Sequence, residues 1–209
     1  MPSWLKPTRA DERASTRLSA GASAKRTTGL PRYRARYVRA GRIRRPDGEY
    51  TRFAILPAAL QRAVEQGLFC AKPVFLNHAA LPGGPDLANL IGFTARSAVY
   101  DPAQQAVDGE IELLETPAGR LAQTLIEAAL AEPAADIGLS MVFYPVWGEN
   151  PADGEPAIVG VRHVESVDLV FQPAADGRIL HALSAEAEAS EIRQTKVCHL
   201  QLSQFQLVK

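Results

Sequence analysis

The chain has 209 residues, 46% of them hydrophobic, which suffices for the core of one domain of ordinary size. No apolar run approaches the ~20 residues of a membrane span, and the only two cysteines, Cys70 and Cys198, have no metal-ligand spacing. The net charge is zero, but residues 1–45 carry thirteen Lys or Arg against two acidic residues, and the rest of the chain is correspondingly acidic. We therefore expect no membrane contact, no metal and no cofactor.

Composition divides the chain into three parts. Residues 1–29 are rich in Ser, Thr, Ala, Arg and Lys without a sustained period, which predicts a flexible basic arm. Residues 30–180 carry the strand and helix patterns of a folded domain, and residues 181–209 are expected to form a C-terminal tail that contacts a partner or is processed. The basic stretch could bind nucleic acid, an acidic partner or the acidic body of the chain itself.

Within residues 30–180, alternating and continuous apolar runs predict about seven strands. We expect them at residues 33–41, 50–55, 74–76, 90–99, 107–114, 137–147 and 157–171. Two helices are predicted, at residues 58–66 and from Pro117 to Pro133, the second capped by Thr116, and residues 182–192 could form a third helix or a linker. The second helix has an expected apolar stripe of Leu121, Leu125, Ala128 and Ala129. This order favours an α+β fold, a small and mostly antiparallel β-barrel surrounded by a few helices, over a doubly wound parallel sheet.

Three chemically useful residues lie at or beside predicted strands. His78 ends the run Val-Phe-Leu-Asn-His, Ser140 follows Gly138 and Leu139, and Asp168 lies in the run Ser-Val-Asp-Leu-Val. A serine nucleophile needs a base to take its proton and a third group to orient that base. A lone histidine is more often structural, but His78 precedes a Gly- and Pro-rich loop of the kind that opens a cleft.

Ser140 is set apart from ordinary strand serines by its surroundings. Gly138 before it would let the backbone approach a substrate closely, and an apolar run follows it. The pattern differs from the Gly-x-Ser-x-Gly elbow of α/β-hydrolases, because residue 142 is Val and no helix is predicted to follow. The α/β-hydrolase fold is therefore disfavoured.

The acid is chosen from two candidates on one predicted strand. In an alternating strand, Asp168 shares a face with Val164, Ser166 and Val170, whereas Glu165 belongs to the opposite face. A carboxylate between Val167 and Leu169 is costly to bury without a partner, and a histidine would supply one. Asp168 is therefore the first choice and Glu165 the alternative, and either could instead pair with an arginine of a neighbouring strand.

Three segments, in their order along the chain, resemble the prohead (capsid maturation) serine proteases of tailed phages. They are Leu76-Asn-His78, Gly138-Leu-Ser140, and Ser166-Val-Asp-Leu-Val170 followed by Pro173-Ala174. That family shares a fold with the herpesvirus assemblins. The resemblance covers roughly residues 33–180, and its third segment is the most specific. It implies a small β-barrel ringed by helices, with Ser140 as nucleophile and His78 as base. The usual position of the third member, which varies among His, Glu and Asp, is Ser166 here, two residues before Asp168.

The resemblance also implies where and on what the protein acts. It implies an endopeptidase inside the procapsid, in the host cytoplasm, that cleaves scaffold and capsid-protein segments and itself, with possible self-association. Two alternatives remain at this point. One is a non-catalytic assembly or scaffold factor with the same fold, and the other is a nucleic-acid-binding module that uses residues 1–45.

Overall fold

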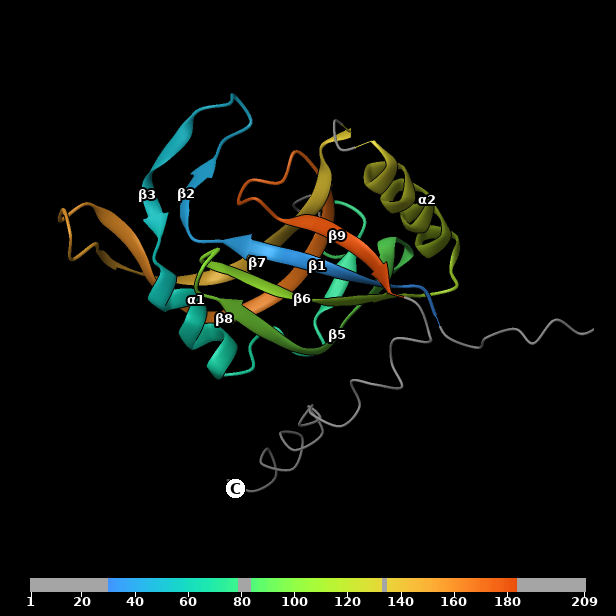
Figure 1. Cartoon of the computed structure of the whole chain (residues 1–209), viewed down its shortest axis with the longest axis horizontal. Helices are drawn as coiled ribbons and strands as arrows, with labels where there is room; N and C mark the ends of the chain where they lie inside the picture. The colour runs from blue at the N-terminus through green and yellow to red at the C-terminus, as the bar shows by residue number, and fades with distance from the viewer. Residues whose placement is uncertain (1–29, 79–83, 133–134, 184–209) are drawn as a thin grey trace, which may run out of the picture.

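The computed structural model describes residues 30–78, 84–132 and 135–183 (Figure 1). These residues form nine strands and two α-helices in an α+β arrangement. The strands are β1 Arg32–Arg39, β2 Gly41–Arg44, β3 Tyr50–Ile55, β4 Pro73–Phe75, β5 Leu90–Asp101, β6 Ala106–Leu113, β7 Ile137–Glu149, β8 Pro156–Phe171 and β9 Arg178–Leu183. The helices are α1 Pro57–Glu65 and α2 Pro117–Ala131, with a short 3₁₀ turn at Leu87–Asn89. Residues 1–29 and 184–209, where the arm and most of the tail are predicted, lie outside the described residues.

The strands form two sheets. One has the order β4-β5-β6-β1-β9 and the other the order β2-β3-β8-β7. Neighbouring strands are antiparallel except for β3 and β8, which run parallel. Strand β9 pairs with β1 as far as Leu183, three residues beyond the expected end of the folded domain.

The expected closed or nearly closed barrel is not what the described residues form. The two sheets meet where Leu76, directly after β4, makes an isolated parallel bridge with Leu169 of β8. Strand β4 has three residues and already pairs with β5 on its other side. A closed barrel needs a staggered ladder that continues around the whole circumference, and a single bridge does not supply one. The fold is therefore two joined sheets with a shared core.

That core lies between the sheets and the two helices. Its centre includes Tyr37 of β1, which is 1% exposed and stacks on Phe69 with ring centroids 5.9 Å apart. The Tyr37 hydroxyl donates a hydrogen bond of 2.6 Å to the carbonyl oxygen of Glu110, so the ring is buried without leaving its polar group unpaired. Burial raises the pKa of this hydroxyl far above its usual range.

Helix α2 confirms its predicted start but not its predicted apolar stripe. The Thr116 side chain accepts a hydrogen bond of 3.0 Å from the N–H of Gly119, as a capping residue does. However, Leu121 is 49% exposed, and the buried positions are Gly119, Ala122 and Ile126. The helix carries alanine and leucine on several sides, so its sequence alone left the buried face ambiguous. Neither helix of the described residues is long and apolar enough to cross a membrane.

Much of the positive charge of residues 1–45 belongs to the folded body. Seven of its thirteen cations lie on β1, β2 and the residue after β2, and six of these seven pair with acidic residues. The pairs are Arg32–Glu110, Arg34–Glu110, Arg36–Asp108, Arg39–Asp176, Arg44–Asp136 and Arg45–Asp47. The basic stretch was expected to bind nucleic acid, an acidic partner or the acidic body of the chain. These six ion pairs are contacts of the third kind.

Candidate active site

The site is organised around the buried carboxylate of Asp168, near the end of β8. This residue is 1% exposed, and its Oδ2 lies 2.8 Å from Nδ1 of His78. Its Oδ1 accepts a hydrogen bond of 3.3 Å from the backbone N–H of Phe75. A buried carboxylate is costly unless both oxygens find partners, and here each has one. The histidine partner expected for Asp168 is therefore present.

A turn after β4 delivers His78 to Asp168. Asn77 adopts a left-handed backbone conformation with φ of 66°, which asparagine tolerates better than most residues. Its N–H donates to the carbonyl oxygen of Leu169 at 2.8 Å, and the N–H of Leu76 donates to Asn89 at 2.9 Å. These contacts fix both residues before His78 and set the point from which its side chain reaches β8. The turn was not predicted from the sequence, although an asparagine at this place is compatible with it.

The contact with Asp168 determines how the imidazole of His78 is used. A carboxylate only accepts hydrogen bonds, so Nδ1 carries a proton and donates it toward Oδ2. In the neutral ring, Nε2 is then the nitrogen with a free lone pair. The His78 side chain is 46% exposed, which leaves it open to the surface while its partner is buried. This is the arrangement a general base requires.

Ser140 lies on β7 directly opposite Asp168 in the antiparallel ladder. Opposite residues of such a pair share a face of the sheet, with Cβ atoms roughly 4.5–5.5 Å apart. Ser140 and His78 also line one cavity of about 260 Å³, together with Val170 and Phe171 of β8. Within the described residues no hydrogen bond joins the Ser140 hydroxyl to His78. Catalytic hydrogen bonds of this kind often tighten only when substrate binds.

The role expected for Gly138 is different from the one the structure assigns. A Cβ at this position would lie 2.1 Å from the carbonyl oxygen of Gly177 and 2.9 Å from the ring of Pro173. The glycine is needed because the segment before β9 crosses β7 at backbone distance, rather than to admit a substrate. It still matters for the site, since this contact holds the strand that carries Ser140.

The alternative acid, Glu165, lies away from His78. Its carboxylate is 43% exposed and lies 3.8 Å from Nε2 of His163, whose side chain is 51% exposed. Glu165 also acts on Lys72, where burial lowers the pKa of the ammonium and the nearby carboxylate partly opposes that shift. Ser166, at the position the resemblance favours for the third member, is buried opposite Val142. Of these residues on β8, Asp168 is the one that contacts His78.

Two arginines at the mouth of the cavity were not among the predicted site residues. Arg44 and Arg45 line it beside His78 and Ser140. Arg44 ends the short strand β2 and Arg45 follows it, just before the turn at Pro46, where the sequence shows only a run of cations. From the sequence, both arginines belong to a basic stretch without a site. Their place beside the cavity depends on the contact between β2 and the segment after β8, which the sequence does not reveal.

Comparisons with protein-family models, curated proteins and solved structures found no match to this chain. In the described ranges, no group of three or more His, Cys, Asp or Glu residues is arranged to hold a metal ion. Chemically, the site combines a serine hydroxyl, an accessible imidazole and a buried acid that orients it. Such a set of groups can support nucleophilic attack on a carbonyl by an activated serine.

Proposed function

We propose that this protein is a serine endopeptidase of the phage prohead type, which cleaves scaffold and capsid-protein segments, and itself, during head maturation. The observation that carries the proposal is the 2.8 Å contact between His78 and a carboxylate that is 1% exposed, on the strand position opposite Ser140. The contact orients an imidazole whose side chain stays 46% exposed and lines the same cavity as Ser140. The phage setting and the assemblin relationship rest on the sequence resemblance.

The proposed reaction follows from the positions of the three side chains. Ser140 Oγ attacks the peptide carbonyl carbon as its proton passes to Nε2 of His78, and the Nδ1–H of the resulting imidazolium is held by Asp168. The tetrahedral intermediate collapses when His78 returns the proton to the leaving amine, which leaves an acyl ester on Ser140. Water, deprotonated by His78, then hydrolyses this ester and restores the serine.

The surroundings of the cavity favour a polypeptide substrate over a small molecule. The cavity shares Arg44 and Ala174 with a larger neighbouring cleft of about 740 Å³, so the two form one extended depression in the surface. An extended peptide needs several adjoining subsites, whereas small ligands are mostly enclosed in one pocket. An open depression that passes a serine and a histidine suits cleavage within a chain.

The proposal is tested by incubating the purified full chain with scaffold and major capsid proteins and following cleavage by mass spectrometry. Ser140→Ala should abolish every cut, including cuts in the protease, while His163→Ala should leave the same fragments. A protein that binds scaffold equally well with and without Ser140 and never cleaves it would instead be a non-catalytic assembly factor.

A nucleic-acid-binding module is disfavoured by the charges that the structure describes. Six of the seven arginines between residues 32 and 45 already form ion pairs with the chain's own carboxylates. Nucleic-acid binding that falls steeply with salt and disappears when residues 1–29 are removed would favour this module instead.

A further inference from the structure

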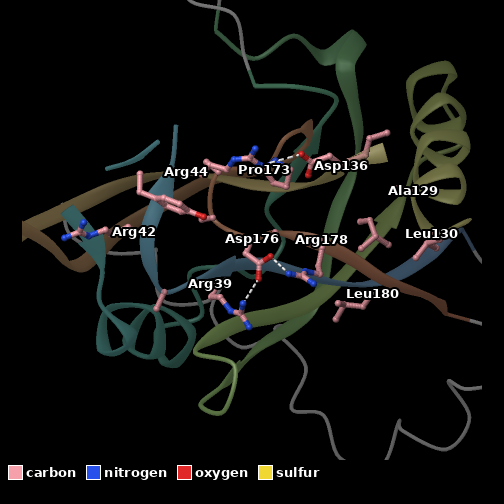
Figure 2. Close-up of a pocket in the computed structure, with 17 residues that line it drawn as sticks. Arg39, Arg42, Arg44, Ala129, Leu130, Asp136, Pro173, Asp176, Arg178 and Leu180 are labelled. Atoms are coloured by element: carbon pink, nitrogen blue, oxygen red, sulfur yellow. Dashed lines mark hydrogen bonds and ion pairs between the residues drawn. The ribbon is translucent and has the colours of Figure 1, made fainter. Parts of the chain in front are cut away.

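A cleft of about 740 Å³ adjoins the cavity that holds Ser140. It runs between β2, the segment that follows β8, strand β9 and the C-terminal end of α2 (Figure 2). Arg44 and Ala174 line both the cleft and the cavity of Ser140. A polypeptide that passes Ser140 on this side therefore enters the cleft beside Arg44, and this arginine meets a part of the substrate close to the cleaved bond.

The cleft carries an excess of positive charge. Four arginines and two aspartates line it, which leaves a net charge of +2. Figure 2 shows Arg39 and Arg178 beside Asp176, whose carboxylate pairs with both of them. Arg42 lines the cleft as well, and none of the ion pairs among the described residues includes it. A surface with such an excess attracts the carboxylates of a binding partner and disfavours its cations.

Arg44 is fixed through its backbone, whereas its guanidinium is only loosely paired. Its N–H donates a hydrogen bond of 2.8 Å to the carbonyl oxygen of Ala174, which holds the end of β2 against the segment after β8. Its guanidinium reaches Asp136 only at 3.7 Å, and the two side chains are 44% and 42% exposed. This distance exceeds that of a hydrogen bond, so the planar donors of the guanidinium remain available to a second carboxylate.

The backbone around Asp136 determines where its carboxylate meets Arg44. Asp136 and Gln172 lie just beyond the ends of β7 and β8, and both have left-handed backbones, with φ of 50° and 55°. The N–H of Gln172 donates to the carbonyl oxygen of Asp136 at 2.8 Å. Left-handed conformations of residues other than glycine cost free energy, so the surrounding fold must hold this pair in place. Asp136 is thus a fixed carboxylate against which the position of Arg44 can be judged.

The place of Arg44 along β7 indicates which substrate residue it can contact. Its partner Asp136 directly precedes β7, and Ser140 is the fourth residue of that strand. A strand rises about 3.3 Å per residue, so the guanidinium lies roughly 10–13 Å from Ser140 along the strand. An extended substrate covers this distance in about three or four residues. A carboxylate bound by Arg44 therefore belongs to a residue three or four positions from the cleaved bond, and not to a residue at the bond itself.

We infer that Arg44 is a specificity-determining residue, which selects polypeptide segments with an Asp or Glu three or four positions from the cleaved bond. The substrate carboxylate takes the place of Asp136 at the guanidinium. Arg42 and the excess charge of the cleft favour further acidic residues in the same segment. The selection of cleavage sites rests on the proposed endopeptidase function, whereas the binding of an acidic segment in the cleft does not.

The preference is tested by digesting a mixed peptide library with the full chain and identifying the products by mass spectrometry. We expect Asp and Glu to be enriched three or four positions from the cut, on one side of it. Two peptides that differ only in Glu or Gln at that position should differ about five- to tenfold in kcat/KM, chiefly through KM, because the contact is remote from the reacting bond. Cleavage without this enrichment, or with acidic residues enriched only at the cut, overturns the inference and leaves the endopeptidase proposal standing.

Variants at position 44 assign the preference to one side chain. Arg44→Gln should make the glutamate and glutamine peptides equivalent substrates, and Arg44→Glu should favour a third peptide with lysine at the same position. The matched control is Arg162→Gln on β8, an exposed arginine that lines neither the cleft nor the cavity, and it should keep the ratio of the parent protein. Circular dichroism verifies folding. An unchanged ratio in folded Arg44→Gln overturns the inference.

A binding measurement separates the inference from the proposed reaction. In the full chain carrying Ser140→Ala, a fluorescein-labelled ten-residue peptide with two glutamates should bind about fivefold more tightly at low salt than its glutamine counterpart, and adding Arg42→Gln and Arg44→Gln should remove the difference. If the parent protein cleaves no peptide but this difference is found, the endopeptidase proposal fails and the acidic-segment cleft stands. If neither the cleavage preference nor the binding difference is found, the inference is overturned.

Discussion

Strand β8 carries two acids that each face a histidine, and the two pairs differ in every respect that matters for catalysis. Asp168 is 1% exposed and lies 2.8 Å from His78, while a backbone N–H binds its second oxygen. Glu165 is 43% exposed and lies 3.8 Å from His163, which is itself half exposed. Both pairs join a carboxylate to an imidazole, but only one of them lies beside a serine in a cavity.

The difference shows what burial adds to a histidine–acid pair. An exposed pair is screened by water and contributes little, because both side chains remain free to move. A buried carboxylate is held by its neighbours, so it fixes the ring orientation and the tautomer of its histidine. The pairs also differ in origin, since His163 and Glu165 are neighbours in sequence whereas His78 and Asp168 are 90 residues apart. The pair of His78 and Asp168, which only the folded chain brings together, is the one suited to the proposed function.

The largest difference between the pairs should appear when the nucleophile or a histidine is removed. Ser140→Ala and His78→Ala should each lower kcat/KM by roughly 10⁴-fold or more, because neither the attack nor the proton transfer has a substitute. His163→Ala should change it less than twofold. The measurement is a cleavage assay with circular dichroism as the control for folding, and equal losses for both histidines would contradict the distinction.

Replacing the acids by amides should give the next largest contrast. Asp168→Asn can keep the hydrogen bond from Phe75, but its amide then donates to Nδ1 of His78, so the ring proton moves to Nε2 and the base is lost. We expect a fall in kcat of roughly 10³–10⁴-fold. Glu165→Gln should have little effect. A loss with Glu165→Gln that matches the loss with Asp168→Asn would return the role of acid to Glu165.

The pairs should also differ in their effect on pH dependence. Protonation of His78 removes the lone pair that accepts the Ser140 proton, so kcat/KM should fall about tenfold per pH unit once the solution is acidic enough to protonate it. His163→Ala should leave this profile unchanged. Initial rates over a series from neutral to acidic pH check both statements, and a flat profile in the parent protein would contradict the role of His78 as the base.

The smallest expected effect concerns the turn that delivers His78. Asn77→Gly keeps the left-handed conformation accessible and should retain most activity, whereas Asn77→Val, with a branched Cβ, strains a backbone with φ of 66°. We expect Asn77→Val to lower kcat about tenfold with little change in KM, because His78 and not the substrate is displaced. Equal kinetics for the two variants would show that the turn does not position the base.

Local patterns in the sequence predicted the structural features that depend on residues close to one another in the chain. The strand at residues 50–55 has the predicted bounds, Thr116 caps the helix that follows it, and alternation along β8 distinguished Asp168 from Glu165 before any contact was known. Each of these features is determined within a few residues. Local context also singled out Ser140 and His78, the resemblance supported both, and their catalytic roles stay predictions.

Features that depend on distant segments could not be predicted in this way. Gly138 faces the backbone of Gly177, Arg44 and Arg45 at the end of β2 reach the cavity, and α2 buries Ala122 and Ile126 in place of Leu121. The number of predicted strands suited a barrel. Closure, however, depends on whether the short strand β4 can pair along β8, and the hydrophobic pattern of a sequence does not tell which strands pair. These contacts become visible only once the two sheets are placed.

The central claim is that the fold activates Ser140, and labelling with a fluorophosphonate, which phosphonylates activated serines, tests it most directly. Intact and peptide mass spectrometry of the full chain should show a single adduct on Ser140 that is lost in His78→Ala and strongly reduced in Asp168→Asn. The same adduct should persist in His163→Ala and Glu165→Gln. An unlabelled Ser140 in the folded parent protein, or labelling that is indifferent to His78, would contradict the account.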